Sequence, residues 1–281
     1  MKNIGININS TKDKKLTKKV SGFITENIKK LNVKIYNDLL DFTDEEAKKT
    51  EMMISLGGDG TILSTSKIIS KYGIPILGIN LGHLGFLTSA EISELGDCMD
   101  KLVRGKFYIE DRTMLECRVE YENQIKSYYS LNEVVISKKT LARILEYSIY
   151  IDDKFYTNIT ADGIIISTPT GSTAYSLSAG GPIVYPTMNL MQITPICPLS
   201  IGIRTMILPS SSNIKVNLKE KHETAYLTLD GQNSFEINNL HNIIIKEAPF
   251  KCKLVRIQGY DYFKVLRKKI ISRTKECEDE N

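Results

Sequence analysis

The sequence predicts two domains of different class: an α/β domain over residues 1–104, joined by the C-terminal segment 258–281, and a β-rich domain over residues 105–257. The first third of the chain alternates short apolar runs with amphipathic helical stretches, which is typical of a mostly parallel sheet with covering helices. After Gly105 the pattern changes to β-branched and aromatic residues that alternate with polar ones. The length of 281 residues fits two domains of about 100–200 residues each, or one large one.

The first domain opens with a strand, because Ile4, Ile6 and Ile8 alternate with other residues. Ser10 and Thr11 are candidate N-caps for a helix over 16–28, whose apolar residues repeat at helical spacing. A short apolar run at 52–56 ends in glycines, as a buried parallel strand does. The other predicted elements are strands at 32–36 and 74–79 and helices at 62–71 and 91–104.

The second domain is predicted from runs with period-two alternation. Asp152-Asp153-Lys154 lies between two such runs and predicts a hairpin turn. Helical spacing returns at 260–272, so a last helix could cross back to the first domain. The predicted strands are 108–121, 127–137, 147–156, 214–218, 225–229, 243–245 and 253–257.

Composition and charge exclude several classes of protein. Hydrophobic residues make up 42% and charged residues 25%, which argues against a disordered tail, a collagen or a coiled-coil rod. The net charge of +4 allows a small anionic ligand but is weaker than the basic signal of nucleic-acid-binding proteins. Because no apolar run approaches the about 20 residues of a membrane span and no secretory signal is visible, we expect a cytoplasmic protein with neither membrane nor nucleic-acid partners.

The cysteines are odd in number, far apart and never in a C-x-x-C pair. This spacing disfavours a zinc site or a disulfide framework and fits a reducing compartment. We therefore expect single buried thiols at Cys98, Cys117, Cys197, Cys252 and Cys277.

The strongest local motif is Gly57-Gly58-Asp59-Gly60-Thr61, between an apolar strand and a helix. Glycines let the backbone approach a ligand closely, and the free N–H groups of a helix N-terminus suit phosphate, so Gly57, Gly58, Gly60 and Thr61 form a candidate phosphate loop. Asp59 would repel phosphate unless it abstracted a hydroxyl proton or held a metal ion. The alternative is a tight strand-to-helix turn with Asp59 as N-cap.

Other phosphate-binding signatures are missing from the sequence. The chain has no G-x-x-x-x-G-K-[ST], which excludes a P-loop NTPase, and no G-x-G-x-x-G after its first strand, which disfavours an ordinary dinucleotide dehydrogenase. The histidines, His83, His222 and His241, show no metal-ligand spacing.

A second motif runs from Ala161 to Pro182, where an apolar strand leads into a cluster of small hydroxyl residues. A short helix is predicted to begin near Ser172 or Thr173 and to stop at Gly180. Small residues let a flat ligand lie against the backbone, and hydroxyl groups can bind its polar edge. Turn chemistry would explain two or three of these residues but not so many together.

Leu131-Asn132-Glu133-Val134 lies between these two motifs. An Asn side chain donates and accepts at once, as an adenine edge requires, and a neighbouring Glu can accept from ribose hydroxyls. Asn-Glu before a strand is also a common turn. Arg143 follows, and its planar fork suits a pyrophosphate, although arginines in β-rich segments are usually solvated.

Together these motifs resemble the NAD kinase family, the ATP- or polyphosphate-dependent NAD kinases. LGGDGTIL alone is shared with a wider group that includes diacylglycerol and sphingosine kinases and phosphofructokinase. NLGHLGFL at 80–87, LNEVVI at 131–136 and the stretch at 161–184 are much more specific, and their order and spacing are also similar to the family. The resemblance covers the chain from Leu56 to about Gln232.

The resemblance implies the family's site residues at the matching positions. Asp59 would be the catalytic proton acceptor, with Gly60 beside it in the NAD site, and Asn132 and Glu133 would bind the adenine and ribose of NAD. Tyr185 stands where many members have His and is given no role. The other implied NAD-binding residues are Arg143, Asp162, Thr173, Ala174, Tyr175, Ser176, Leu177, Ser178 and Gln232, with Thr160 and His83 given less weight.

The resemblance also implies a fold and an activity. The fold is a Rossmann-like parallel-sheet domain and a C-terminal β-sandwich domain. The reaction transfers the terminal phosphoryl group of ATP, or of polyphosphate, to the 2′-hydroxyl of the adenosine ribose of NAD and yields NADP. A divalent metal cation such as Mg²⁺ would bridge the phosphates, and the enzyme would be a homodimer or homotetramer. The donor range, the metal ligands and the choice between NAD and NADH stay open.

Two rival functions are compatible with parts of the sequence. A lipid kinase could use the same GGDGT loop, but it should present an apolar or basic amphipathic surface to a membrane, and none stands out. An NAD-sensing module without catalysis would bind NAD and form no NADP, and the intact Asp59 argues against it.

Overall fold

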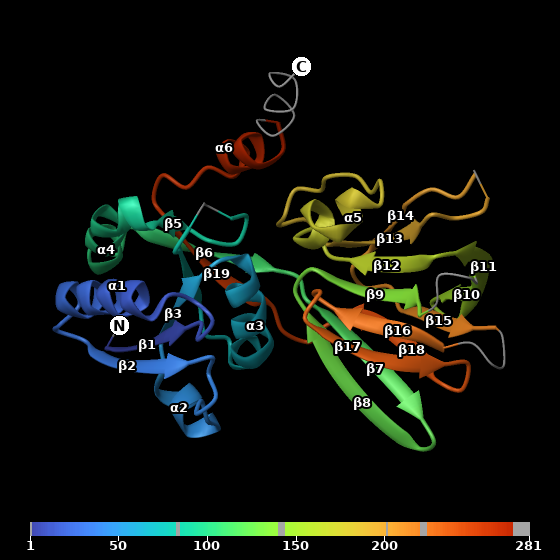
Figure 1. Ribbon diagram of the computed structural model, residues 1–281, viewed down its shortest axis with the longest axis horizontal. Helices are drawn as coiled ribbons and strands as arrows, with labels where there is room; N and C mark the ends of the chain where they lie inside the picture. Colours follow the sequence, from blue (N-terminus) through green and yellow to red (C-terminus); the bar gives the residue numbers. More distant parts are fainter. Residues whose placement is uncertain (1, 83–84, 140–143, 201, 220–223, 272–281) are drawn as a thin grey trace. The chain divides into compact units, whose positions relative to one another are not determined.

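The computed structural model describes residues 2–82, 85–139, 144–200, 202–219 and 224–271. The chain divides into two compact units (Figure 1). Unit 1 holds residues 1–111 and 252–281, and unit 2 holds residues 112–251. Within the described residues, every helix is too short or too polar to serve as a membrane span.

Unit 1 is built on one sheet whose strand order is β2-β1-β3-β4-β19-β6, with β5 paired to β4. The pairs of β1 with β2, β1 with β3, β3 with β4 and β4 with β19 are all parallel. The apolar run read from the sequence is β3, whose residues are all buried, as expected for an inner parallel strand. These strands are β1 (Asn3–Ile8), β2 (Asn32–Asn37), β3 (Met52–Gly57), β4 (Ile76–Asn80), β5 (Ala90–Glu91), β6 (Phe107–Arg112) and β19 (Cys252–Ile257).

Helices cover both faces of this sheet (Figure 1). The apolar residues of α1 and α4 pack with Ile54, Leu56 and Leu77 on one face. On the other face, Thr65 of α3 lies against Ser55, with their hydroxyl oxygens 3.3 Å apart. The helices of unit 1 are α1 (Lys14–Asn27), α2 (Asp44–Lys49), α3 (Asp59–Ile69), α4 (Leu95–Val103) and α6 (Tyr262–Leu266), and single turns occur at η1 (Ser70–Tyr72), η2 (Ile92–Glu94) and η4 (Arg267–Ile271).

The cap predicted for the first helix was wrong. Asp13, not Ser10 or Thr11, caps α1, and its carboxylate accepts from the N–H groups of Lys15 and Leu16 at 2.7 and 2.8 Å. An Asp next to the first turn satisfies N–H groups that have no partner within the helix and also complements the positive end of the helix dipole.

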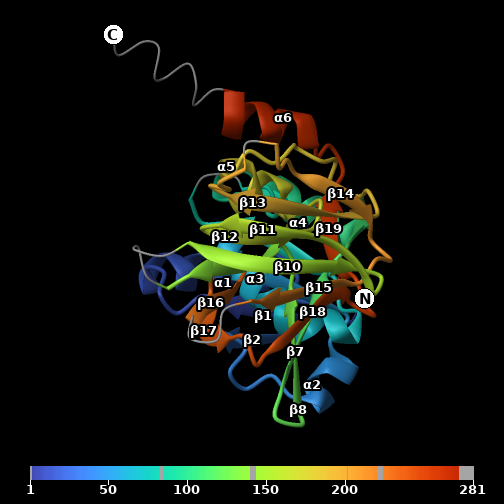
Figure 2. The ribbon, with the colours of Figure 1, turned by 90° about the vertical axis from the view of Figure 1, so that its right-hand side faces the viewer.

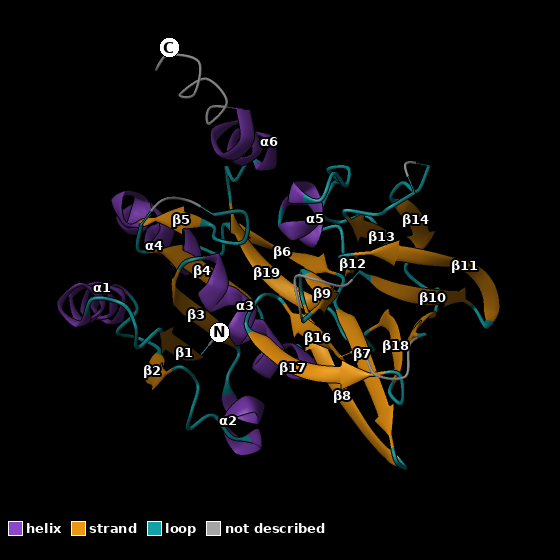
Figure 3. Cartoon of the chain, turned by 45° about the vertical axis from the view of Figure 1, so that its right-hand side comes forward, coloured by secondary structure: helices purple, strands orange, loops and turns teal. Residues whose placement is uncertain are grey.

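Unit 2 is almost entirely strand, apart from η3 (Gly171–Thr173) and α5 (Tyr175–Ser178) (Figure 3). Its two sheets have the orders β11-β10-β15-β18-β7-β8 and β14-β13-β12-β9-β16-β17. In Figure 2 the strands β11, β10 and β15 of the first sheet run across the view, one below another. The strands are β7 (Leu115–Tyr121), β8 (Gln124–Ser130), β9 (Glu133–Lys138), β10 (Leu145–Ile151), β11 (Lys154–Ala161), β12 (Gly163–Ser167), β13 (Leu190–Ile196), β14 (Met206–Pro209), β15 (Ile214–Leu218), β16 (Thr224–Leu229), β17 (Asn233–Asn238) and β18 (Asn242–Glu247).

One buried apolar cluster joins the two sheets of unit 2. Leu115 and Tyr147 come from the first sheet, and Val134, Ile164 and Leu227 come from the second. Two antiparallel sheets that share one core form a β-sandwich. The predicted fold class, a parallel-sheet α/β domain with a C-terminal β-sandwich domain, is therefore confirmed.

Two strands that lie within the predicted β-rich range join the other sheet. β6 and β19 are neighbours in the sheet of unit 1, beside β4. Period-two alternation indicates a strand but does not show which sheet it enters. The predicted hairpin at Asp152 and Asp153 is confirmed, because β10 and β11 pair across it and both residues have positive φ angles of 49° and 62°.

The prediction of buried thiols is right for most of the cysteines. Cys98, Cys117 and Cys252 are buried and take part in no disulfide, whereas Cys197 is exposed, and Cys277 lies outside the described residues. Burial raises the pKa of the Cys98 and Cys117 thiols to about 12, so both stay protonated and unreactive at neutral pH.

Candidate active site

The glycine-rich loop of unit 1 connects β3 directly to α3. Gly58 precedes the helix without a side-chain cap, and Asp59 is already its first residue. The alternative role of Asp59 as an N-cap is therefore wrong. A Cβ atom on Gly57 would lie 2.0 Å from Oγ1 of Thr61, so this turn requires glycine there.

Asp59 points to a second loop, the one read from the sequence as NLGHLGFL. Its two carboxylate oxygens accept hydrogen bonds from the backbone N–H of Phe86 at 2.9 Å and of Leu87 at 3.0 Å. A Cβ atom on Gly85 would lie 2.0 Å from the carboxylate, so a side chain there would displace Asp59. The two motifs thus hold the Asp59 side chain between them.

These loops line a cavity of about 430 Å³ in unit 1. Glycines leave the backbone open on this side, as close approach of a phosphate requires. Lys12 and Lys269 bring positive charge from the two ends of the chain, and Asp13 and Asp59 are the carboxylates. Sequence reasoning missed both lysines, because neither belongs to a motif and only the fold brings them to the glycine loops.

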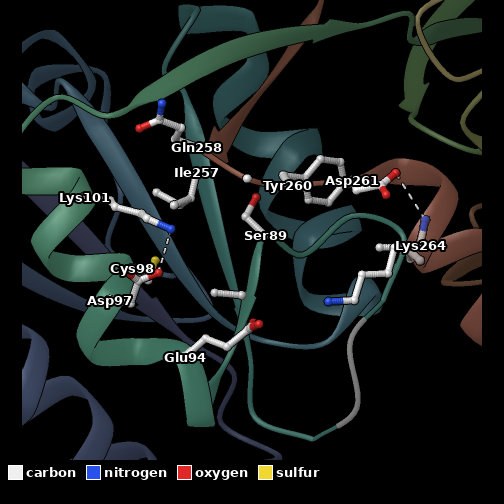
Figure 4. A pocket seen from close by; sticks show the side chains of 13 residues that line it. Ser89, Glu94, Asp97, Cys98, Lys101, Ile257, Gln258, Tyr260, Asp261 and Lys264 are labelled. Atoms are coloured by element: carbon white, nitrogen blue, oxygen red, sulfur yellow. Dashed lines mark hydrogen bonds and ion pairs between the residues drawn. The ribbon is translucent and has the colours of Figure 1, made fainter.

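A second cavity of unit 1, of about 130 Å³, suits an anion less well (Figure 4). Glu94, Asp97 and Asp261 line it, with Lys101 and Lys264 as its cations. Lys101 is already paired with Asp97 at 2.7 Å, so the lining has more negative than positive charge. A triphosphate would be repelled there, so of these two cavities the one beside Asp59 is the better candidate.

In unit 2 the structure brings together three segments that are distant in the sequence. The Asp230 carboxylate accepts from the N–H groups of Leu131, Asn132 and Glu133 at 3.2, 2.8 and 3.2 Å. The Asn132 carbonyl accepts from the N–H of Thr168 at 2.9 Å. Asp230, which sequence reasoning did not assign, therefore fixes the backbone that presents Asn132 and Glu133.

The small-residue segment packs against this loop. A Cβ atom on Gly171 would lie 2.2 Å from the Asn132 carbonyl oxygen, so only glycine fits. In the short helix that follows, Tyr175 and Ser178 are exposed, whereas Ser176 is buried with its hydroxyl 3.0 Å from that of Thr194. Ser176 therefore anchors the segment to the protein interior, whereas the side chains of Tyr175 and Ser178 face solvent.

Within unit 2 the remaining predicted site residues fall into two groups. Gln232 lies exposed on the turn just after Asp230, and so belongs with the Asn132 loop. Asp162 pairs with Lys138 at 2.6 Å, at the end of β12 opposite to Thr168, and Thr160 lies on β11, which precedes β12 in the chain and belongs to the other sheet. The five residues of β12 separate Asp162 from the Asn132 loop by roughly 16 Å at about 3.3 Å per residue. His83, Arg143 and His222 lie outside the described residues.

No group of three or more His, Cys, Asp or Glu side chains suited to a metal ion occurs in the part of the chain that the structure describes. Mg²⁺, however, is usually held by one or two carboxylates together with substrate phosphates. Each oxygen of Asp59 accepts one N–H hydrogen bond, whereas Asp13 caps α1 through Oδ1 alone. Oδ2 of Asp13 is therefore the better placed carboxylate oxygen in the cavity lining for a nucleotide-bound cation.

Comparisons with known proteins point to one family. The ATP-NAD kinase N-terminal domain matches residues 3–107, and the ATP-NAD kinase C-terminal domain matches residues 131–257. A protein named NAD kinase from Clostridium botulinum (strain Kyoto / Type A2) is 44% identical over 282 residues, which covers 100% of both chains. Another protein of that name from Clostridium tetani is 44% identical over 274 residues, covering 96% of this chain and 99% of its own.

Solved structures agree with this result. Yeast NADH kinase in complex with NADH superposes with a TM-score of 0.81 at 26% identity, covering 97% of this chain and 88% of its own. An NAD kinase from Archaeoglobus fulgidus in complex with ATP has a TM-score of 0.74 at 24% identity, covering 96% and 99% of the two chains, and it supports the fold.

Proposed function

The chain belongs to the ATP-NAD kinase family, and we infer that it transfers the terminal phosphoryl group of ATP to the 2′-hydroxyl of the adenosine ribose of NAD, which yields NADP and ADP. The observation that supports the chemistry best is the carboxylate of Asp59, held by two backbone N–H groups at the edge of a glycine-lined cavity. We propose that Asp59 is the catalytic proton acceptor for the attacking hydroxyl.

The protein's part in such a transfer is mainly positioning and charge stabilisation. Gly57, Gly58, Gly60 and Thr61 form the phosphate loop, and Lys12 with Lys269 offsets part of the charge of the triphosphate. The 2′-hydroxyl attacks the terminal phosphorus, the bond to the bridging oxygen breaks, and the hydroxyl proton passes to Asp59. Polyphosphate carries the same terminal group and is a second candidate donor.

A divalent cation, with Mg²⁺ the first choice, belongs to the donor complex. When bound to the nucleotide it neutralises charge on the phosphates. Asp13 is the residue we assign to hold it.

NAD is recognised by unit 2 in this proposal. Asn132 meets the adenine edge and Glu133 the ribose hydroxyls, because Asp230 presents both from a fixed backbone. The proposed NAD-binding residues of the family resemblance are Asp59, Gly60, Asn132, Glu133, Arg143, Asp162, Thr173, Ala174, Tyr175, Ser176, Leu177, Ser178 and Gln232, with Thr160 and His83 at lower weight.

We further propose a cytoplasmic homodimer or homotetramer with sites shared between subunits. Asp162 and the Asn132 loop lie at opposite ends of β12 within one chain. An Asp162 that contacts NAD could therefore serve the site of a second copy. The described cysteines form no disulfide, which fits a reducing compartment.

One coupled assay tests this function. Purified protein is mixed with NAD, ATP and Mg²⁺, and NADP is read by an NADP-specific dehydrogenase. Steady NADP formation is expected. Phosphorylation of diacylglycerol without NADP would favour a lipid kinase, and NAD binding by calorimetry without NADP would favour a sensing module.

A further inference from the structure

Arg256, on β19, is fully buried, with an exposed fraction of 0%. A buried guanidinium needs partners for its N–H donors and for its charge. Its Nε donates to the Glu110 carboxylate at 3.0 Å, which supplies the opposite charge. The rest of the fork is directed at backbone oxygens.

Those oxygens belong to the loop that holds Asp59. Nη2 of Arg256 donates to the Phe86 carbonyl at 3.2 Å, and Nη1 donates to the carbonyls of Leu87 at 3.0 Å and Thr88 at 3.1 Å. Three successive carbonyls are therefore fixed by one side chain. A lysine, with a single ammonium group, lacks the planar fork that does this.

One peptide group connects the arginine to the carboxylate. The carbonyl of Phe86 and the N–H of Leu87 belong to the same peptide plane. Its oxygen accepts from Arg256, while its N–H donates to Asp59 at 3.0 Å. Hydrogen bonds in such a chain polarise one another, so the bond to Arg256 strengthens the bond to Asp59 as well as orienting it.

The arginine itself is held from a second direction. The ring of Tyr260 stacks on the guanidinium, with 4.0 Å from the guanidinium carbon to the ring centre. Tyr260 and Ser89 line the small cavity of Figure 4, and the Ser89 hydroxyl lies 3.4 Å from Nη1 of Arg256. Glu110, the loop carbonyls and the aromatic ring together leave the guanidinium one orientation.

We propose that Arg256 is a positioning residue for phosphoryl transfer: it fixes the backbone of residues 86–88 so that their N–H groups hold the Asp59 carboxylate in its reactive orientation. This inference rests on the proposed role of Asp59. Arg256 donates to the carbonyl oxygens of this loop, and the N–H groups of the loop donate to Asp59. Arg256 therefore acts on Asp59 only through the loop.

The test is Arg256→Lys, which keeps a positive charge beside Glu110 but loses the fork. We expect kcat to fall about tenfold or more, because small displacements of a catalytic group are costly, while the KM for NAD changes less than about twofold. Lys253→Gln is the matched control, since Lys253 lies on the same strand and pairs with Asp111 at 3.3 Å at the surface. Its kcat should equal that of the unchanged protein.

A double-mutant cycle distinguishes an effect of Arg256 on Asp59 from a general loss of structure in the active site. In an Asp59→Asn background, Arg256→Lys should lower kcat no further, because the group that it positions is gone. The same fold-loss in both backgrounds, or an Arg256→Lys variant with unchanged kcat, would overturn the inference. Normal kcat in Asp59→Asn alone would instead remove Asp59 from the role of proton acceptor, on which this inference rests.

If Arg256→Lys does not fold, as judged by circular dichroism, Glu110→Gln replaces it. Gln keeps an acceptor for Nε but removes the charge that holds the guanidinium. The expected result is again a lower kcat with little change in KM, and no further loss in the Asp59→Asn background. Equal losses in both backgrounds would again contradict the inference.

Discussion

Asn132 and Glu133 differ from most polar residues near a turn because their backbone is fixed by a buried acid. Asp230, with 6% exposure, accepts from both of their N–H groups, so the backbone that carries the two side chains is ordered before a ligand binds and little further entropy is lost there. We expect Asn132→Ala and Glu133→Ala to weaken NAD binding by about 1–3 kcal/mol each, since each leaves a ligand group unpaired.

Calorimetry of NAD binding to the two variants measures this loss. Thr228→Ala is a suitable control, because that hydroxyl lies 3.0 Å from Ser234 on the exposed side of β16 and β17. Dissociation constants for Asn132→Ala and Glu133→Ala equal to the control would remove both residues from the NAD site.

Residue chemistry made part of this site predictable from sequence. A lone Asp among glycines is unusual in itself, and the Asn-Glu pair, a common turn when alone, is supported by the motifs on either side of it, so both can be named without coordinates. Lys12, Lys269 and Arg256 cannot, because a lysine or arginine on its own is usually solvated and only the folded sheet brings them to the glycine loops.

At the scale of elements, the loop between β4 and β5 determines where the Asp59 carboxylate lies. A methyl group on Gly85 would meet the Asp59 carboxylate at 2.0 Å. We expect Gly85→Ala to displace the carboxylate and to lower kcat about tenfold or more. Gly96→Ala, in α4, is the control, because its added Cβ meets nothing within 4 Å.

Steady-state kinetics and thermal unfolding of both glycine variants provide the measurement. The control should keep its kcat and gain about 0.5–1 kcal/mol of stability, as Ala does over Gly inside a helix. A Gly85→Ala variant with the kcat of the control would show that the loop does not fix Asp59.

The elements themselves were predictable to different degrees. β3 is buried on both faces, so its continuous apolar run is plain in the sequence. β6 and β19 were assigned to the wrong domain, because their alternation matches that of the sandwich strands while their pairing depends on contacts between residues about 150 positions apart.

At the scale of the whole molecule, the proposal of shared sites makes a prediction about mixed oligomers. Asp59→Asn and Asp162→Ala should each be nearly inactive alone. If the two residues serve one site from different chains, mixing the variants should restore part of the activity as subunits exchange. Light scattering at micromolar concentration should show a dimer or tetramer. A fully active monomer, or no rescue despite proven exchange, would contradict shared sites and leave the kinase reaction unaffected.

The central claim, that Asp59 accepts the proton of the attacking hydroxyl, is tested most directly by kcat of Asp59→Asn beside its dissociation constant for NAD. General-base catalysis is typically worth about 10²–10⁴-fold, so kcat should fall at least about 100-fold while the affinity for NAD changes far less. Asn also turns an amide N–H toward a backbone N–H of the loop, so a lower unfolding temperature is expected as well. A variant with near-normal kcat would contradict the account.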